Sequence, residues 1–348
     1  MYALEHSRWA ATWGWTEVTK SGPQMTSPVE IAIVGYPGAG SACMHGLTDL
    51  FLYADHFARE QATSDQPFVR ITHWQPRAEG DDLECSYESQ PDVSGRCRLV
   101  VVPGCQLAPP APGSSPQAAA WIARRHAEGA VVAAVCGGVF LLADSGLLNG
   151  RRATTHWMFA GELQRRHPGL RVDPDRLVID DCDILTAGGV LAWADMGLTL
   201  VERLLGRTVM CSTARFMLID PPGREQRFYG EFTPPLGHGD KTIVSLQHWL
   251  QANPIATSSV ADLAKRAGLS TRTFLRRFVK ATGLKPSEYH QRLRIARSRE
   301  MLELTRDTVN QIAGAVGYED PRGFRRTFKR VIGLSPGEYR RRFQRAVD

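Results

Sequence analysis

The sequence lacks the long apolar runs that mark membrane proteins. No stretch of its 348 residues approaches the roughly 18–20 consecutive apolar residues that cross a bilayer. The first 28 residues mix tryptophan and tyrosine with charged and hydroxyl side chains, without the apolar core of a signal peptide. We therefore expect no membrane partner, and we interpret residues 1–28 as a flexible N-terminal extension.

Cysteines at metal-binding spacing are also absent. The seven cysteines are scattered and include no Cys-x-x-Cys pair, which argues against a structural zinc site and against a disulfide framework. We expect no metal and no cofactor. A reducing, cytoplasmic setting fits this cysteine usage best.

Basic residues are concentrated at the C-terminal end of the chain. From residue 241 onward there are 22 Lys and Arg against 9 Asp and Glu, whereas the preceding residues hold 20 against 27. A basic region joined to an acidic body is typical of proteins that bind nucleic acid.

One pattern occurs twice within this basic region. Its parts are Ala264 and Gly268, Phe274 to Phe278 and Gly283 to Tyr289 in the first copy, and Ala313 and Gly317, Phe324 to Phe328 and Gly333 to Tyr339 in the second. Ala and Gly match at an offset of 49 and the remainder at 50. Solenoids need at least three copies, so two arginine-rich copies of helix, short turn and helix favour a pair of helix-turn-helix units.

The second helix of each copy has two chemically different faces. The phenylalanines of each pair are four residues apart and share one face. At 100° per residue the opposite face carries Arg272, Arg276 and Lys280 in the first copy, and Arg322, Arg326 and Arg330 in the second. For either helix alone, the alternative is a charged face that is only solvated. Because both helices place cations opposite a phenylalanine pair, we favour DNA contact. The candidate DNA-binding residues are Thr271, Arg272, Thr273, Arg276, Lys280, Arg322, Arg325, Arg326 and Arg330.

The body of the chain alternates predicted strands and helices. Strands are expected at 29–35, 98–102 and 130–136, a strand pair at 176–180 and 183–187, and helices at 45–59, 121–127, 139–145 and 189–205. Alternation of this kind predicts a parallel sheet with helices on both faces. We expect a sensor domain over 29–218, a linker over 219–240 rich in turn residues, and a DNA-binding domain over 241–345.

Cys136 lies at a predicted strand-to-helix turn and is followed by two glycines. Such a turn exposes a thiol, and the helix N-terminus behind it favours the thiolate. His156 is a candidate base for this nucleophile. The alternative is that Cys136 is only a small residue in a crowded turn. Ligands of parallel sheets bind at the carboxyl ends of the strands, which makes Gly104, Cys105, Cys136, Gly137 and His156 the candidate ligand-binding residues.

Both parts resemble known families. Gly317-Tyr-Glu-Asp-Pro, Phe324-Arg-Arg-Thr-Phe328 and Gly333-Leu-Ser-Pro are similar to the signature of AraC/XylS-type regulators, while Val135-Cys136-Gly137-Gly138 and the segment from Leu147 to Trp157 resemble the PfpI/class I glutamine-amidotransferase-like domain. Together they resemble the GlxA-like regulators. The resemblance implies a flavodoxin-like α/β sandwich followed by an all-α domain with two helix-turn-helix units.

The resemblance also implies a function. The partners would be double-stranded promoter DNA, RNA polymerase, a second copy of the chain and a small effector related to amino acids or quaternary amines. Enzymes of the superfamily place an acid where this sequence has Cys43, so Cys136 and His156 are expected to be vestigial rather than catalytic. We expect a transcription regulator, more often an activator in this group, and not an enzyme. The alternatives are a Cys–His amidase or protease, or a Cys136 redox sensor, fused to the DNA-binding module.

Overall fold

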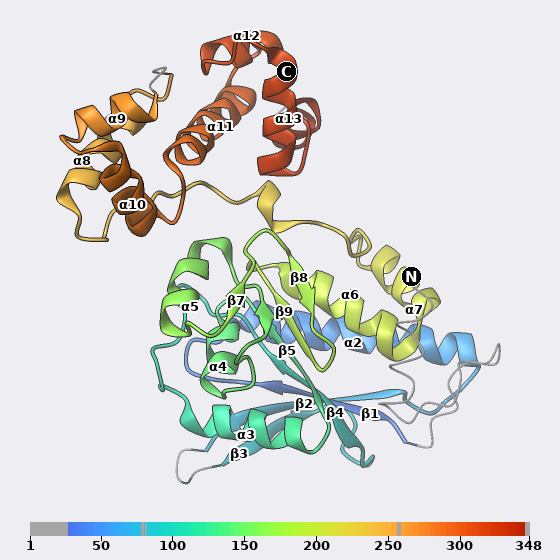
Figure 1. The fold of residues 1–348 in the computed structure, drawn as a ribbon. Coiled ribbons are helices and arrows are strands. Elements are labelled where there is room, and N and C mark those ends of the chain that lie inside the picture. Colours follow the sequence, from blue (N-terminus) through green and yellow to red (C-terminus); the bar gives the residue numbers. More distant parts are fainter. Residues whose placement is uncertain (1–26, 78–79, 81, 256–258, 345–348) are drawn as a thin grey trace. The chain divides into compact units, whose positions relative to one another are not determined.

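The computed structural model describes residues 27–77, 80, 82–255 and 259–344, and the chain divides into two compact units between Gln226 and Arg227 (Figure 1). Apart from its last two positions, the expected N-terminal extension lies outside the described residues.

The first unit is organised around a twisted sheet with the strand order β3-β2-β1-β4-β5-β9-β8. The five inner strands run parallel, and the edge strands β3 and β8 are antiparallel to their neighbours. The strands are β1 (Val29–Val34), β2 (Val69–Pro76), β3 (Leu83–Glu88), β4 (Arg96–Val102), β5 (Val131–Val135), β8 (Val178–Asp180) and β9 (Ile184–Ala187), with β6 (Arg152–Ala153) and β7 (Arg171–Val172) forming a separate pair.

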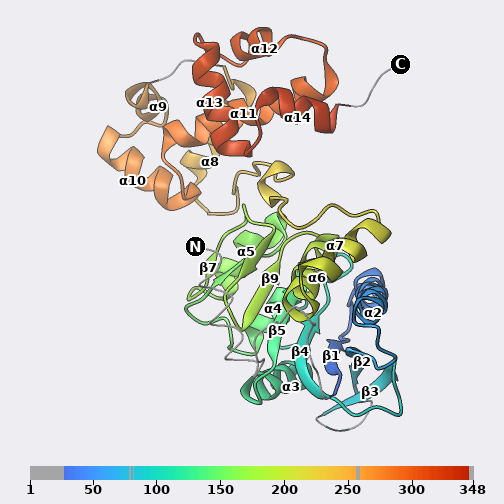
Figure 2. The same cartoon turned by 90° about the vertical axis from the view of Figure 1, so that its right-hand side faces the viewer.

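Helices cover both faces of the sheet (Figures 1 and 2). On one face lie α2 (Ser41–Ala62), α6 (Ala192–Leu205) and α7 (Arg207–Phe216), and on the other α3 (Pro116–Ala127), α4 (Gly138–Asp144) and α5 (Ala160–Arg166). Strand β1 shows why two layers are needed: Ile31 and Ile33 enter one core, while Ala32 and Val34 enter the other. The predicted flavodoxin-like sandwich is therefore confirmed.

The expected strand pair at 176–180 and 183–187 is present as β8 and β9, but other elements were missed. Strands β2, β3 and β7 and helices α5 and α7 have no counterpart among the expected elements. Strand β2 contains Thr72, His73 and Trp74, whose polarity hides it from a search for apolar runs. His73 is nevertheless buried, and its Nε2 lies 2.8 Å from the Thr48 hydroxyl.

Two parts of the expected linker are packed, one within each unit. In the first unit, the buried Gln226 accepts a hydrogen bond from the Trp157 backbone N–H at 3.0 Å and donates to the Thr155 and Pro174 carbonyls at 2.9 Å each. In the second unit, the Phe232 ring contacts Tyr289. The segment thus lacks periodicity, as expected, yet much of it is held by side-chain contacts.

The second unit is helical. Its described helices are α8 (Lys241–Ala252), α9 (Val260–Arg266), α10 (Thr271–Thr282), α11 (Pro286–Leu304), α12 (Val309–Ala315), α13 (Pro321–Ile332) and α14 (Pro336–Phe343). They match the expected pair of helix-turn-helix units, and the long helix α11 joins the two. Two separate cores form, one around Phe274 and Phe278 and the other around Phe324 and Phe328. Helix α11 contributes Tyr289 to the first and Ile295 to the second.

Candidate functional site

Helices α10 and α13 carry the candidate DNA-binding residues, and each begins at a capped turn. Ser270 and Asp320 accept hydrogen bonds from backbone N–H groups of the first helical turn. Upstream, Gly268 and Gly317 adopt φ values of 65° and 82°, a region that glycine enters without strain. The turn residues therefore determine where both helices start.

The phenylalanine pairs anchor both helices. All four rings are fully buried, as the helical wheel predicts. Within each helix-turn-helix unit the two phenylalanine rings contact each other, and one of them contacts a tyrosine further along the chain. The ring contacts are Phe274–Phe278, Phe278–Tyr289, Phe324–Phe328 and Phe328–Tyr339, with centroids 5.3–5.7 Å apart. Rings of this size bury enough apolar surface to fix which face of the helix points outward.

The opposite faces are cationic and exposed. The exposed residues of this face are Arg272, Arg276 and Lys280 on α10, and Arg322, Arg326 and Arg330 on α13. Some of the candidates have internal partners. Arg330 donates to the Gln291 amide oxygen at 2.6 Å and Arg325 to the Asn310 oxygen at 2.8 Å. The hydroxyl of Thr273 accepts from Ser270 at 3.0 Å, while Thr271 is exposed.

Arg277 lies beside Arg276 but has a different role. Its Nε and Nη2 donate to the two carboxylate oxygens of Asp240 at 2.8 and 2.6 Å. Asp240 also caps α8 by accepting from the Ile243 N–H. The hydrogen bonds from Arg277 lower the pKa of Asp240 to about 2. This arginine therefore joins α10 to α8, and two of its guanidinium nitrogens are already bound to Asp240.

The two outward faces differ in one respect that the charge pattern did not reveal. Leu275 and Val279 are 37% and 42% exposed, and at helical spacing they lie beside Arg272 and Arg276. The corresponding positions of α13 hold Arg325 and Lys329. One helix thus presents apolar and cationic groups together, whereas the other presents cations alone. A comparison of the two copies residue by residue would have found this difference.

The second candidate site lies at the carboxyl ends of β4 and β5. Cys136 follows β5 directly and has a φ of 52°, so the predicted sharp turn exists. The turn is held by backbone groups: the Cys136 N–H donates to the Ala187 carbonyl at 2.6 Å, and the Thr155 hydroxyl donates to the Cys136 carbonyl at 2.6 Å. Gly104 and Cys105 follow β4 and lie at the same carboxyl-end edge of the sheet, which we call the rim.

The prediction that this turn exposes the thiol is wrong. Cys136 is 1% exposed and Cys105 6% exposed. The interaction with the Cys105 thiol, together with burial, raises the pKa of Cys136, and the interaction with the Cys136 thiol lowers the pKa of Cys105 to about 7. The Cys136 side chain belongs to the core on the α2 and α6 face of the sheet, and the sulfur of Cys105, which follows β4, packs against Gly137.

His156 does not form the expected base for Cys136. Its Nδ1 accepts a hydrogen bond from the Met158 backbone N–H at 3.2 Å, and burial lowers the pKa of the imidazole. Among the described residues, no hydrogen bond joins His156 to Cys136. The position expected to carry the supporting acid holds Cys43, whose burial raises the pKa of its thiol to about 12. Asp49, the next acidic residue along the chain after Cys43, is exposed.

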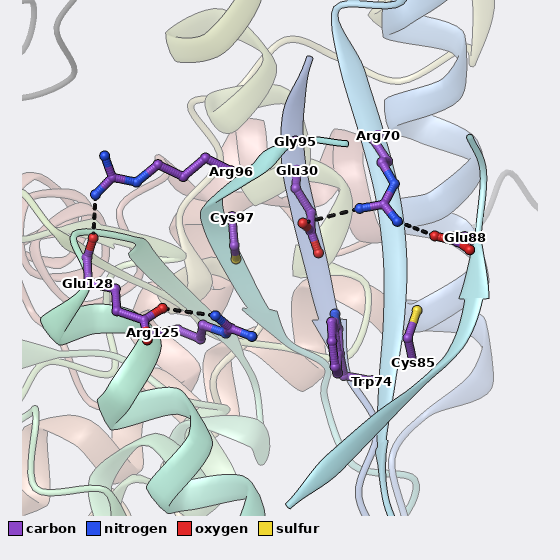
Figure 3. A pocket seen from close by; sticks show the side chains of 10 residues that line it. All are labelled: Glu30, Arg70, Trp74, Cys85, Glu88, Gly95, Arg96, Cys97, Arg125 and Glu128. Atoms are coloured by element: carbon purple, nitrogen blue, oxygen red, sulfur yellow. Dashed lines mark hydrogen bonds and ion pairs between the residues drawn. The ribbon is translucent and has the colours of Figure 1, made fainter. Parts of the chain in front are cut away.

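A pocket of about 440 Å³ lies elsewhere, at the amino-terminal ends of β1, β2 and β4 (Figure 3). Arg70 lies between Glu30 and Glu88 and forms ion pairs with both. Trp74 and Arg125 also line it, with the guanidinium carbon 5.7 Å from the indole centroid. Sequence reasoning missed this pocket, because its ten lining residues are spread over five segments that lie far apart in the sequence. None of the five candidate ligand-binding residues lines it.

Two kinds of feature are absent from the described part of the chain. It contains no cluster of three or more His, Cys, Asp or Glu side chains arranged to hold a metal ion. In the same residues, no helix combines the length and the apolarity that crossing a membrane requires.

Two protein families match parts of the chain. The DJ-1/PfpI family matches residues 83–203, and a helix-turn-helix domain family matches residues 263–342. The second match contains α10, α13 and all the candidate DNA-binding residues, and the first contains Cys105, Cys136 and His156.

Curated relatives include regulators and one enzyme. The HTH-type transcriptional regulator CdhR from Pseudomonas aeruginosa is 28% identical over 65% of this chain and 66% of its own length. The HTH-type transcriptional regulator GlxA from Rhizobium meliloti is 27% identical over 56% of this chain and 60% of its own length. An isonitrile hydratase from Pseudomonas putida is 40% identical, but over 25% of this chain and 36% of the enzyme. The chain therefore spans about half to two thirds of the length of the regulators it matches.

Proposed function

Because the chain joins a DJ-1/PfpI domain to an AraC-type helix-turn-helix domain, as the GlxA-type regulators do, we propose that it is a DNA-binding transcription regulator of that group. The observation that carries the proposal is the repeated geometry of α10 and α13. Each helix buries a phenylalanine pair and presents cations at matching positions outside. Two such faces on one chain favour two contacts with one DNA duplex.

The recognition helices read successive segments of the major groove. In helix-turn-helix pairs such segments are about one helical turn, roughly 34 Å, apart. Arg272, Arg276, Arg322 and Arg326 are assigned to base edges or adjacent phosphates, because the arginine fork matches the two acceptors of guanine. Lys280 and Arg330, near the C-terminal ends of their helices, are assigned to phosphates. The hydrogen bonds of Arg330 and Arg325 to Gln291 and Asn310 position their guanidinium groups and leave other N–H donors available.

The two helices read different chemistry. Leu275 and Val279 favour contact with thymine methyl groups, because an exposed apolar side chain gains by excluding water from a methyl in the groove. The matching positions Arg325 and Lys329 favour acceptors or phosphates. One half of the operator is therefore expected to be richer in thymine at the contacted positions than the other.

We propose the domain boundaries that the sequence suggests, namely a sensor domain over 29–218, a linker over 219–240 and a DNA-binding domain over 241–345. Family resemblance supports a homodimer, contact with RNA polymerase and a cytoplasmic location. The effector is a small molecule of the amino-acid or quaternary-amine class. Its site is either the rim at Gly104, Cys105, Cys136, Gly137 and His156, or the charged pocket around Arg70, which offers both signs of charge to a zwitterion.

Hydrolysis is disfavoured by the residues at the rim. A Cys nucleophile needs an accessible thiolate and a base within hydrogen-bond reach. Here the Cys136 thiol is buried with a raised pKa, and His156 is engaged through Nδ1 by a backbone N–H. We assign the domain to sensing rather than to catalysis, although part of it is similar to an isonitrile hydratase.

Binding measurements on the full chain test the proposal. Genome-wide mapping of bound sites would supply an operator, and fluorescence anisotropy would then measure its affinity. Arg272→Ala and Arg322→Ala are each expected to weaken specific binding by ~1–3 kcal/mol while leaving binding to random DNA less affected. Unchanged affinity and specificity in both variants would remove these assignments. Absence of any sequence-specific binding by the parent would remove the proposed function.

A further inference from the structure

Residues 228–238 of the expected linker, which we call the strap, contact both helix-turn-helix units. At the second of these units, a methyl group added to Gly333 would lie 2.7 Å from the Cε1 of Phe228, so the Phe228 ring covers the residue that ends α13. The Tyr229 ring contacts Phe343 of α14, with the ring centroids 5.5 Å apart. The start of the strap is therefore fitted to the C-terminal end of a recognition helix and to the helix that follows it.

At the first helix-turn-helix unit, the strap packs against a ring and binds a buried amide. Phe232 packs against the core of this unit, and its ring centroid lies 5.2 Å from that of Tyr289. The buried side chain of Gln247, on α8, donates to the Pro235 carbonyl at 3.0 Å, and its amide oxygen lies 2.8 Å from Nε2 of His238. The strap thus connects the two separate cores that α11 also joins.

Helix α11 adds a further connection through Arg294. Its Nε donates to the Pro254 carbonyl at 3.1 Å, and its Nη1 donates to the Gly317 carbonyl at 3.0 Å. Pro254 follows α8 in the first helix-turn-helix unit, whereas Gly317 lies in the turn before α13 in the second. Because the donors of a guanidinium group have a fixed geometry, this side chain holds the two carbonyls at one separation.

We propose that Phe232 and Arg294 are positioning residues that fix the distance between α10 and α13, and with it the spacing of the two DNA segments that one chain binds. This inference rests on the proposed function. The two cores are separate, so without these connections a bend in α11 would change the distance between the recognition helices. Two contacts with one duplex strengthen each other only when the geometry allows both at once, so a fixed distance favours one spacing and penalises others.

Fluorescence anisotropy with the full-length protein tests the inference on three duplexes. The first is the operator, the second is the operator with one base pair inserted between the two contacted segments, and the third carries a single segment. The insertion moves the second segment by about 3.4 Å and turns it by about 35°. We expect the parent to bind the lengthened operator at least about tenfold more weakly than the operator itself.

The double variant Phe232→Ala/Arg294→Ala removes one contact from each connection. It should bind the operator about tenfold more weakly than the parent, lose less than about threefold in affinity on the insertion, and bind the single segment as the parent does. The matched control is Trp249→Ala/Arg297→Ala, which removes a ring packed against the same core and an arginine that pairs with Glu300 within α11. The control should keep the parent's tenfold loss on the insertion.

Where the double variant does not fold, Phe232→Leu/Arg294→Lys replaces it and should show an intermediate loss of affinity on the insertion. The inference is overturned if the folded variant keeps the parent's loss on the insertion, if the control tolerates the insertion as well as the variant does, or if the variant binds the single segment and the operator with equal weakening. In each of these cases specific binding by the parent leaves the proposed function intact. Absence of specific binding by the parent removes both the inference and the proposed function.

Discussion

Adjacent arginines on α10 allow a sharp test of which side chains read DNA. Arg276 and Arg277 share one helix and one chemistry, but only Arg277 is engaged, through two hydrogen bonds to Asp240. Arg276 is exposed and, among the described residues, has no hydrogen bond or ion pair. Replacing each by alanine removes the same charge from the same turn. The two variants therefore match in charge and differ in geometry.

Arg276→Ala should weaken operator binding by ~1–3 kcal/mol, which is about 5- to 150-fold in Kd, if its fork contacts guanine. Arg277→Ala should change Kd much less, because its fork faces α8, and should instead lower Tm by leaving Asp240 without its partner. Anisotropy titrations on the operator duplex, repeated at several salt concentrations, measure the first effect, and calorimetry measures the second.

The salt series separates two kinds of contact. A lost phosphate contact reduces the slope of log K against log salt by about 0.9, whereas a lost base contact leaves the slope and reduces specificity. Equal losses of affinity in both variants would show that charge alone matters and would refute the assignment. An unchanged Kd in Arg276→Ala would do the same.

Three further predictions follow from single contacts. If Leu275 and Val279 contact thymine methyls, replacing those thymines by uracil should weaken operator binding by ~0.8 kcal/mol per methyl, about fourfold in Kd. This loss is expected in the parent but not in Leu275→Ala. An equal loss of affinity in both proteins would contradict the contact. The folded pKa of Asp240 is about 2, whereas an unfolded aspartate titrates near ~3.9, so the stabilisation from this carboxylate is complete above about pH 5. The difference in Tm between the parent and Asp240→Asn should therefore close as pH falls from about 4 to about 2. A difference that does not depend on pH would refute the linkage. Phe274→Ala and Phe324→Ala should each lower the free energy of unfolding by ~3–5 kcal/mol. Because the two cores are separate, amide hydrogen exchange should become faster first within the core that contains the mutated ring. Equally faster exchange in both cores would contradict that separation.

Local chemistry made the second unit predictable from its sequence. Gly268, Gly317 and the Phe pairs act within one or two turns of their own positions, so spacing along the chain was enough to place the turns and the buried faces. The same reasoning missed Leu275 and Val279, because attention to charge alone overlooks apolar neighbours on an exposed face. Arg277 shows the complementary limit, since its partner Asp240 lies 37 residues away in the chain.

The rim was predictable in shape but not in chemistry. The turn at Cys136 follows from a strand, a small residue and two glycines in succession, which is local information. The burial of its thiol depends on core residues from other segments and on Gly104, which lies against the Cys136 Cβ, and these contacts cannot be read from spacing. Strand β2 was missed for a related reason, since its polar residues are satisfied by partners such as Thr48 that lie far away in sequence.

The turn at Cys136 shows that the backbone form of a nucleophile site can be held independently of the side chains around it. A non-glycine residue at φ 52° is disfavoured by ~1–2 kcal/mol, and here the conformation is held by the Ala187 carbonyl and the Thr155 hydroxyl. Both partners bind main-chain atoms of Cys136, so they act whatever the side chain does. Catalysis needs side chains in addition, namely an exposed thiolate, a free base and a supporting acid. Because backbone and side chains contribute separately, the turn can persist while the Cys136 thiol is buried in the core and Cys43 stands at the position expected for the acid.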